Sequence, residues 1–294
     1  MLQLTRVGDG PVLTPNPESH WEKDAVCNAA VTRYAGHVHL LYRAVAHSPG
    51  DPNRSYIGHA WSEDGLHFAR HPVPALSPGE TPEESQGVED PRVVAIDGAF
   101  YMQYTAYNLV SAQIAMARST DLERWERLGI VISDRLFGWN KDASLFPARV
   151  RGRYCMMHRP DPDIFVAFSD DLRAWGDHAR VMGPEFPWES KKIGGGAPPI
   201  LTEQGWLMVY HGVDDALVYR LGIALLDRDD PTKVLRRQSE PILEPQTEWE
   251  RVGDVPNVVF TCGALLEGDR LAVYYGAADK VIGLAVGDVR DFLG

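Results

Sequence analysis

The stretch Ile57-Gly58-His59-Ala60, a short apolar run that ends in alanine, recurs along the chain and decides the fold. The related runs are IAMA at 114–117, IFVA at 164–167, LGIA at 221–224 and IGLA at 282–285. Successive copies start 57, 50, 57 and 61 residues apart. Repeats of about 40 to 60 residues that contain several strands each are typical of propeller blades. The repeat therefore predicts five structural units.

Two further apolar runs precede each copy of this stretch. The nearer runs are HVHLLYRA from His37, AFYMQYTAY from Ala99, RYCMMHRP from Arg153, GWLMVYHGV from Gly205 and RLAVYYGAAD from Arg270. The farther runs are NAAV at 28–31, DPRV at 90–93, DASL at 142–145, GAPP at 196–199 and NVVF at 257–260. Each unit thus contains at least three strands in the same order.

The remaining pattern also favours an all-β protein. No long stretch has an apolar period of 3.6 residues, whereas short runs rich in Val, Ile, Leu, Tyr and Phe alternate with turn residues. We predict a five-bladed β-propeller with a central funnel-shaped active site, in which residues 1–294 form a single domain. The N-terminal segment is expected to help close the ring.

Similar turns follow the first three copies, namely SEDGLHF from Ser62, STDLERW from Ser119 and SDDLRAW from Ser169. They are expected to lead into an outer fourth strand. Their Ser and Asp side chains suit the backbone groups of a turn, and the aromatic residue suits packing between blades. A structural role is the favoured interpretation, and ligand binding is the alternative.

Composition and charge exclude several classes of protein. The formal net charge of −12, with no run rich in Lys or Arg, argues against nucleic acid as a partner. No apolar run approaches the length that spans a bilayer, and the N-terminus lacks the apolar core of a signal peptide. We therefore expect a soluble cytoplasmic protein. The three cysteines have no metal-binding spacing and are expected to be reduced core residues.

Residues at the start of each innermost strand, and near the end of the next strand, converge on the axis of a propeller. The polar residues at these places are Asn28, Arg43, Glu89, Asp90, Arg92, Tyr107, Lys141, Asp142, His158, Arg159, Lys192, His211, Asn257 and Asp279. Charges at buried strand ends are costly unless they are paired or used. The set predicts a ligand site, and a structural ion-pair network is the alternative.

An acidic pair, Glu89 and Asp90, stands beside a basic set formed by Lys141, Arg159, Lys192 and His211. Hydrolysis of a glycoside normally requires two carboxylates. Phosphorolysis requires only the acid, because phosphate is the nucleophile and is held by cationic donors. The glycines at 194–196 lack the pattern of a nucleotide loop and indicate close backbone approach instead. No metal site is predicted.

Several motifs resemble those of glycoside hydrolase family 130, the β-mannoside phosphorylases. They are GVEDPRV at 87–93, KDASLFP at 141–147, HRP at 158–160, KKIGGGAPPI at 191–200, VYHGV at 209–213, VPNVVF at 255–260 and YYGAAD at 274–279. The resemblance covers nearly the whole chain in the right order. It implies a glycosyltransferase-type phosphorylase that uses inorganic phosphate as co-substrate and needs no cofactor, and it allows a homo-oligomer.

The resemblance also implies roles for individual residues. Asp90 corresponds to the general acid, which in this family passes its proton through the 3-hydroxyl of the mannosyl unit. The phosphate-binding residues would be Lys141, Arg159, Lys192, His211 and Tyr219. The substrate-binding residues would be Asn28, Arg43, Glu89, Tyr107, Asp142 and Asp279. Lys141 stands where some relatives have Arg, so this chain lacks one bidentate contact to phosphate.

Three functions are therefore compared. The first is inverting, reversible phosphorolysis of a β-mannoside, with β-1,2-linked manno-oligosaccharides favoured as substrates and α-mannose 1-phosphate as product. The second is hydrolysis of a β-mannoside, against which the retained basic set argues. The third is glycan binding without turnover, which leaves the position of Asp90 beside the basic set unexplained.

Overall fold

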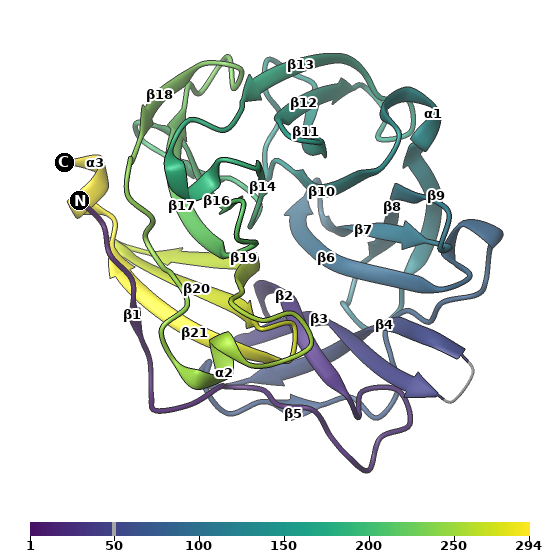
Figure 1. Ribbon diagram of the computed structural model, residues 1–294. Helices are drawn as coiled ribbons and strands as arrows, with labels where there is room; N and C mark the ends of the chain where they lie inside the picture. Colours follow the sequence, from purple (N-terminus) through teal and green to yellow (C-terminus); the bar gives the residue numbers. More distant parts are fainter. Residues whose placement is uncertain (49–50) are drawn as a thin grey trace.

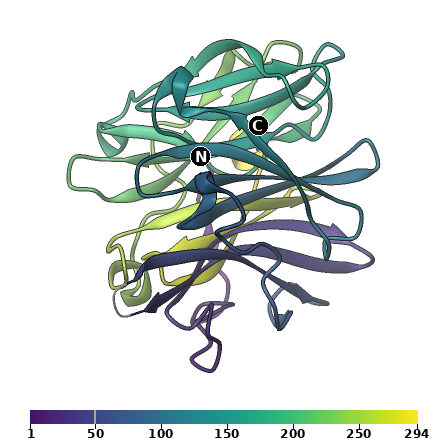
Figure 2. The same ribbon diagram turned by 90° about the vertical axis from the view of Figure 1, so that its right-hand side faces the viewer.

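A computed structural model describes residues 1–48 and 51–294 of the protein. Strands make up most of it, and they lie in five antiparallel groups around a common centre (Figure 1). Seen from the side, the groups stack with their strands inclined to one another (Figure 2). The prediction of an all-β protein is confirmed. Within the described residues, no helix is long and apolar enough to cross a membrane.

Each group contains an antiparallel row of three strands and one outer strand. The first group is β2 (Ala25–Tyr34), β3 (His37–Ser48), β4 (Asp51–Ser62) and β5 (Ala69–Arg70). The second group is β6 (Gly87–Ile96), β7 (Ala99–Tyr107), β8 (Ala112–Ser119) and β9 (Glu126–Ile132). A single parallel pair, Ser55 with Gly87, joins these two groups into one hydrogen-bonded sheet. The third group is β10 (Asn140–Leu145), β11 (Tyr154–Pro160), β12 (Ile164–Ser169) and β13 (Gly176–Met182).

The fourth and fifth groups complete the ring. The fourth is β14 (Lys192–Gly195), β16 (Gly205–Val213), β17 (Tyr219–Leu226) and β18 (Val234–Arg237), with β15 (Ile200–Thr202) also paired to β16. The fifth is β19 (Val259–Glu267), β20 (Arg270–Ala277), β21 (Val281–Asp288) and β1 (Thr5–Arg6). Short helices occupy the connections, namely α1 (Asp134–Phe137), α2 (Glu248–Arg251), α3 (Arg290–Leu293) and the 3₁₀ turns Pro82–Glu84 and Pro187–Glu189.

The repeated runs of the sequence correspond to equivalent strands. All five copies of the alanine-ended run lie in the third strand of a group, and the nearer runs lie in the second. One farther run was predicted wrongly, because residues 196–199 lie between β14 and β15 rather than in a strand. Pro198 and Pro199 have no backbone N–H to donate to a ladder, so the strand breaks there.

The Ser and Asp turns are structural, as predicted. Asp121 accepts hydrogen bonds from the backbone N–H groups of Glu123 and Arg124, at 2.9 Å each. The indole of Trp125 donates to the carbonyl of Leu122, whose backbone has a left-handed φ of 64°. The turns at 62–68 and 169–175 use the same aspartate contacts. They hold the corner that leads into each outer strand.

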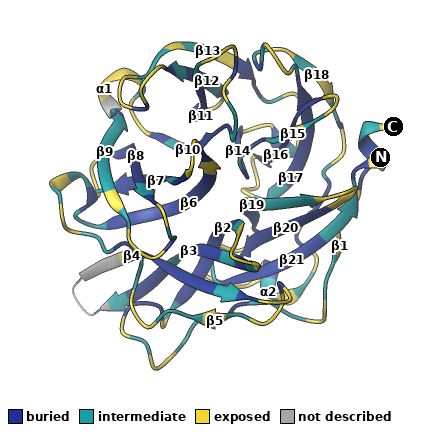
Figure 3. Ribbon diagram, turned by 180° about the vertical axis from the view of Figure 1, so that it is seen from behind, coloured by how far each residue is buried: buried dark blue, intermediate teal, exposed yellow. Residues whose placement is uncertain are grey.

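Hydrophobic side chains fill the space between neighbouring groups. Five large clusters of buried residues each join two adjacent groups. Between the fourth and fifth groups, for example, Val209 and Ile223 pack with Leu271 and Val273. Figure 3 shows that buried residues follow the strands, whereas exposed residues gather in loops and at outer edges. The three cysteines are buried and free.

A buried glutamate accepts hydrogen bonds from a tyrosine and an arginine in four of the five groups. The sets are Tyr42, Glu22 and Arg70; Tyr104, Glu84 and Arg127; Tyr210, Glu189 and Arg237; and Tyr275, Glu250 and Arg6. The third group has histidines instead, with His158 between His178 at 3.0 Å and Asn140 at 3.0 Å. Each set ties the connection before a group to its second and outer strands.

The N-terminal strand closes the ring, as predicted. Thr5 pairs with Val286 and Arg6 with Ala285, so β1 is the outer strand of a group whose other strands come from the C-terminal part of the chain. The Arg6 guanidinium donates two hydrogen bonds of 2.7 Å to Glu250, whose side chain is fully buried. This ion pair fastens β1 to the core.

Replacing Glu250 by glutamine is expected to lower the free energy of unfolding by about 3 kcal/mol, because Arg6 loses its buried counter-charge. Urea denaturation would measure the loss. Glu267→Gln is the matched control, since Glu267 pairs with Arg33 on the surface and its side chain is 44% exposed. The control should change stability by no more than about 0.5 kcal/mol. Equal losses in the two variants would contradict the assigned role of Glu250.

Acid should also unfold the protein through its buried histidines. Burial lowers the pKa of His59 and of His158 from 6.5 to about 3. Between these values the unfolded chain binds protons that the folded chain does not. Stability is therefore complete above pH 6.5 and falls as the pH falls, by up to about 1.4 kcal/mol per pH unit for each histidine.

Urea midpoints measured from pH 7.5 down to pH 4.5 would show this dependence. The variant His59→Gln should have a smaller slope of stability against pH in that interval, because one titrating group is gone. A slope equal to that of the unchanged protein would exclude His59 as a source of the dependence.

Candidate active site

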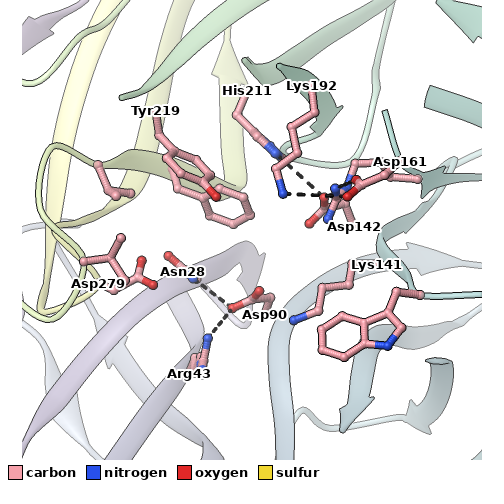
Figure 4. A pocket seen from close by; sticks show the side chains of 15 residues that line it. Asn28, Arg43, Asp90, Lys141, Asp142, Asp161, Lys192, His211, Tyr219 and Asp279 are labelled. Atoms are coloured by element: carbon pink, nitrogen blue, oxygen red, sulfur yellow. Dashed lines mark hydrogen bonds and ion pairs between the residues drawn. The ribbon is translucent and has the colours of Figure 1, made fainter. Parts of the chain in front are cut away.

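The innermost strands β2, β6, β10, β14 and β19 surround the centre of the ring (Figure 1). Residues of these strands contribute to the lining of a pocket of about 260 Å³. Its lining is strongly polar and comes from all five groups. The lining residues are Asn28, Arg43, Asp90, Trp139, Lys141, Asp142, Arg159, Asp161, Lys192, His211, Tyr219, Val255, Val258, Phe260 and Asp279. Ten of the twelve residues predicted to form the site are among them, and their side chains converge as Figure 4 shows.

Three innermost strands carry the same irregularity, a β-bulge at which the backbone is left-handed. Asn28 in β2, Asp90 in β6 and Asp142 in β10 have φ angles of 51°, 52° and 57°. The pairing register with the next strand shifts at each of them. Asn and Asp tolerate this conformation better than most other residues, and a bulge re-aims a side chain. The bulges thus bring these three side chains into the pocket.

One side of the pocket is built around the carboxylate of Asp90. Its Oδ1 accepts a hydrogen bond of 2.8 Å from Nδ2 of Asn28 and lies 3.7 Å from Nη1 of Arg43. Asp279 approaches from the turn after β20 (Figure 4). Burial, together with the negative charges of Asp90 and Glu89, raises the pKa of Asp279 to about 6 against the opposing effect of Arg43. Asp279 therefore takes up its proton at a higher pH than an ordinary aspartate does.

The opposite side of the pocket holds the basic residues. Arg159 Nε lies 2.6 Å from Asp142 Oδ2, and Arg159 also forms an ion pair with Asp161. Lys192 Nζ lies 3.9 Å from Asp161 Oδ2, with its side chain 22% exposed. Burial and the neighbouring charge of Arg159 lower the pKa of Lys192 to about 8. Two cationic groups therefore face the same space, and Lys141, in the same strand group as Arg159, also lines the pocket.

His211 belongs to this side but is not a cation. Burial lowers its pKa to about 3, although the carboxylate of Asp142 at 3.8 Å opposes the shift. The expectation that His211 adds positive charge is therefore corrected, and its neutral imidazole offers a hydrogen bond instead. The ring lies 4.6 Å from that of Phe260 and 5.9 Å from that of Tyr219. These two aromatic rings exclude water from the imidazole.

Glu89 and Tyr107, predicted to contact substrate, do not line the pocket. Glu89 precedes the bulge and points behind it, where it accepts hydrogen bonds from Arg43 at 2.9 Å and Lys141 at 3.2 Å. These two cations outweigh the effect of burial and lower the pKa of Glu89. Tyr107 places its ring 5.6 Å from Lys141 Nζ. Both residues position Lys141, and Glu89 positions Arg43 as well.

Three other polar residues of the predicted set also lie outside the lining. Arg92 is buried and donates to the carbonyls of Gly195 and Gly196 and to Asp142. His158 belongs to the histidine pair of the third group, and Asn257 accepts a backbone hydrogen bond from Tyr219 through its carbonyl. All three residues make contacts within the protein and do not line the pocket.

The glycines before β15 allow close approach, as predicted. A Cβ on Gly194 would lie 2.4 Å from Cε1 of His211 and 2.5 Å from Oδ2 of Asp142. A Cβ on Gly196 would lie 2.6 Å from the carbonyl oxygen of Val209. Only glycine fits at either position, so this run gives His211 and Asp142 their room.

Five lining residues were not predicted, namely Trp139, Asp161, Val255, Val258 and Phe260. Phe260 lies in the quoted motif VPNVVF, and Asp161 follows the quoted motif HRP, so both lay within reach of the sequence. Trp139 precedes KDASLFP and is 53% exposed at the pocket rim. Its indole donates to the carbonyl of Val110, which ties two rim loops together.

Across residues 1–48 and 51–294, no group of three or more potential ligands could hold a metal ion.

Comparisons with known proteins identify the family of the chain. The family model for β-1,4-mannooligosaccharide phosphorylase, glycoside hydrolase family 130, matches residues 11–294. A 1,2-β-oligomannan phosphorylase of Thermoanaerobacter sp. is 47% identical over 99% of both chains. A β-1,2-mannobiose phosphorylase of the same organism is 48% identical over 97% of both.

A solved structure extends the likeness to three dimensions. The β-1,2-mannobiose phosphorylase from Listeria innocua, in complex with β-1,2-mannobiose, superposes with a TM-score of 0.91 at 31% sequence identity. The match covers 99% of this chain and 98% of the other. With the family model, the two sequence relatives and this structure in agreement, the chain belongs to glycoside hydrolase family 130, the mannoside phosphorylases.

Proposed function

We propose that this protein is an inverting phosphorylase of β-mannosides that uses inorganic phosphate as its second substrate. One observation carries the proposal. A single pocket presents the carboxyl group of Asp90 on one side and the cations of Arg159 and Lys192 on the other. An inverting displacement needs this separation, since acid and nucleophile act on opposite faces of the sugar ring. Phosphate needs cationic donors, which a water nucleophile does not.

In the proposed reaction Asp90 supplies a proton that reaches the glycosidic oxygen through the 3-hydroxyl of the mannosyl unit. The bond between this oxygen and C1 breaks as a phosphate oxygen attacks C1 from the opposite face. The products are α-mannose 1-phosphate and the shortened acceptor, which carries the proton. Asn28 and Arg43 orient Asp90 through its Oδ1.

Asn28, Arg43 and Asp279 are proposed to hold the hydroxyl groups of the mannosyl unit, because they surround Asp90 in the pocket. Lys141, Arg159, Lys192, His211 and Tyr219 are proposed to hold phosphate. Asp142, predicted to contact substrate, is proposed instead to orient these donors, since its buried carboxylate contacts Arg92, Arg159 and His211. Pairing with Arg159 outweighs burial and lowers the pKa of Asp142 well below its usual range, so it remains a carboxylate.

We further infer that the five strand groups are the blades of one five-bladed propeller and that residues 1–294 act as one catalytic domain. Each group contributes to the pocket, so no group forms the site by itself. A β-1,2 linkage is favoured for the substrate, because two relatives and the matched structure are named for β-1,2-linked mannosides.

The deciding experiment incubates the purified protein with β-1,2-mannobiose, with and without millimolar phosphate, and separates mannose 1-phosphate from free mannose. Phosphate-dependent mannose 1-phosphate is the expected product. Free mannose formed at the same rate without phosphate would make the protein a hydrolase. No turnover of this or other β-mannosides would favour glycan binding alone.

The variant Asp90→Asn should retain the fold but lose turnover by about 100-fold to 10,000-fold, because it removes the general acid. Initial rates of mannose 1-phosphate formation measure the loss. Asp97→Asn is the control, since Asp97 bonds Tyr154 and Arg149 at the surface and makes the same change of charge. Unchanged turnover by Asp90→Asn would exclude Asp90 as the acid.

The variant Lys192→Ala should raise the KM for phosphate by about 10-fold to 100-fold, the usual value of a hydrogen bond to a charged group. Lys191→Ala is the matched control, because Lys191 is adjacent and exposed and lies outside the pocket lining. With a pKa of about 8, Lys192 loses its charge in alkali, so the KM of the unchanged protein should also rise above pH 8. Equal KM values for the two variants would remove Lys192 from the phosphate site.

A further inference from the structure

Asp161 brings a negative charge to the side of the pocket that holds the cations. It lies in the connection between β11 and β12 and lines the pocket, and its side chain is 58% exposed. Its Oδ1 pairs with Nη1 of Arg159, and its Oδ2 lies 3.9 Å from Nζ of Lys192 (Figure 4). One carboxylate therefore contacts two of the donors assigned to phosphate.

Arg159 has a second carboxylate partner besides Asp161. Asp142, with a side chain only 3% exposed, already lies 2.6 Å from Nε of Arg159 on the inner side. A buried guanidinium needs a counter-charge, and Asp142, which also pairs with Arg92, contributes one from this side. Asp161 pairs instead with Nη1 of Arg159, and both residues line the pocket. The Arg159 side chain is 8% exposed and that of Asp161 is 58% exposed, so only the Asp161 half of this ion pair faces solvent.

We propose that the carboxylate of Asp161 competes with phosphate for Arg159 and Lys192 and thereby sets the affinity of the site for phosphate. This inference rests on the proposed function of the same pocket. A carboxylate and a phosphate oxygen seek the same donors, and two like charges so close repel each other. Phosphate therefore binds by displacing the Asp161 side chain, which is exposed enough to turn towards solvent.

The competition acts on the product as well as on the substrate. The phosphoryl group of mannose 1-phosphate occupies the same donors, and the return of Asp161 to Arg159 and Lys192 favours its departure. Removing the charge of Asp161 should therefore strengthen binding of both phosphate and mannose 1-phosphate. A residue that merely positioned Arg159 would have the opposite effect, because its removal would weaken phosphate binding.

The test compares Asp161→Asn with the unchanged protein. Asp161→Asn should lower the KM for phosphate by roughly two-fold to five-fold, the range expected for a partly exposed ion pair, and leave the KM for the mannoside unchanged. The inhibition constant of mannose 1-phosphate should fall by a similar factor. Asp163→Asn is the matched control, because Asp163 lies in the same connection but pairs with Arg180 at 2.7 Å, outside the pocket lining.

Calorimetric titration with inorganic phosphate alone tests the inference without turnover. Tighter binding by Asp161→Asn than by both the unchanged protein and Asp163→Asn supports it. Equal or weaker binding by Asp161→Asn, or no binding by any of the three, overturns it. Failure of the proposed function is distinguishable, since it would appear as absence of mannose 1-phosphate from every β-mannoside tried, whatever the calorimetry shows.

Discussion

The buried carboxylate of Asp142 is the interaction on which the site depends. It contacts Arg92 at 3.1 Å, Arg159 at 2.6 Å and His211 at 3.8 Å, and these residues come from three different strand groups. A buried charge is tolerated only when it is paired, so the groups must meet at this point for the ring centre to be stable. The same contacts orient the donors assigned to phosphate. Structural pairing and ligand binding thus use one carboxylate.

The sequence predicted much of the fold because aligning the repeats with one another shows which strands are equivalent. Segments such as Ile57-Gly58-His59-Ala60 recur at equivalent strands, and the turns that follow three of them repeat the same side-chain contacts. Closure by the N-terminal segment was also predicted. The error at residues 196–199 has a local cause, the two prolines, which a repeat-based alignment overlooks.

The site was harder to predict, because a shift of one residue in the pairing of two strands decides which side chains face the pocket. Glu89 and Asp90 are adjacent, yet the bulge sends Asp90 into the pocket and leaves Glu89 behind it. In a regular strand neighbours alternate between faces, and a bulge changes which ones face the axis. The low pKa of His211 likewise arises from burial, to which Phe260, distant in sequence, contributes a ring contact at 4.6 Å.

The pairing of β1 with β21 has a consequence for synthesis of the chain. Four of the strand groups consist of strands that follow one another, so each can form as soon as its own segment has left the ribosome. The fifth cannot, because β1 is made first and β21 after all the other strands. Until then β1 lacks the strand with which it pairs, and the hydrophobic cluster between the fourth and fifth groups lacks several of its members. Completion of the ring is therefore a late step, and a ribosome that stalls before β21 leaves an open edge on which chaperones or other chains can act.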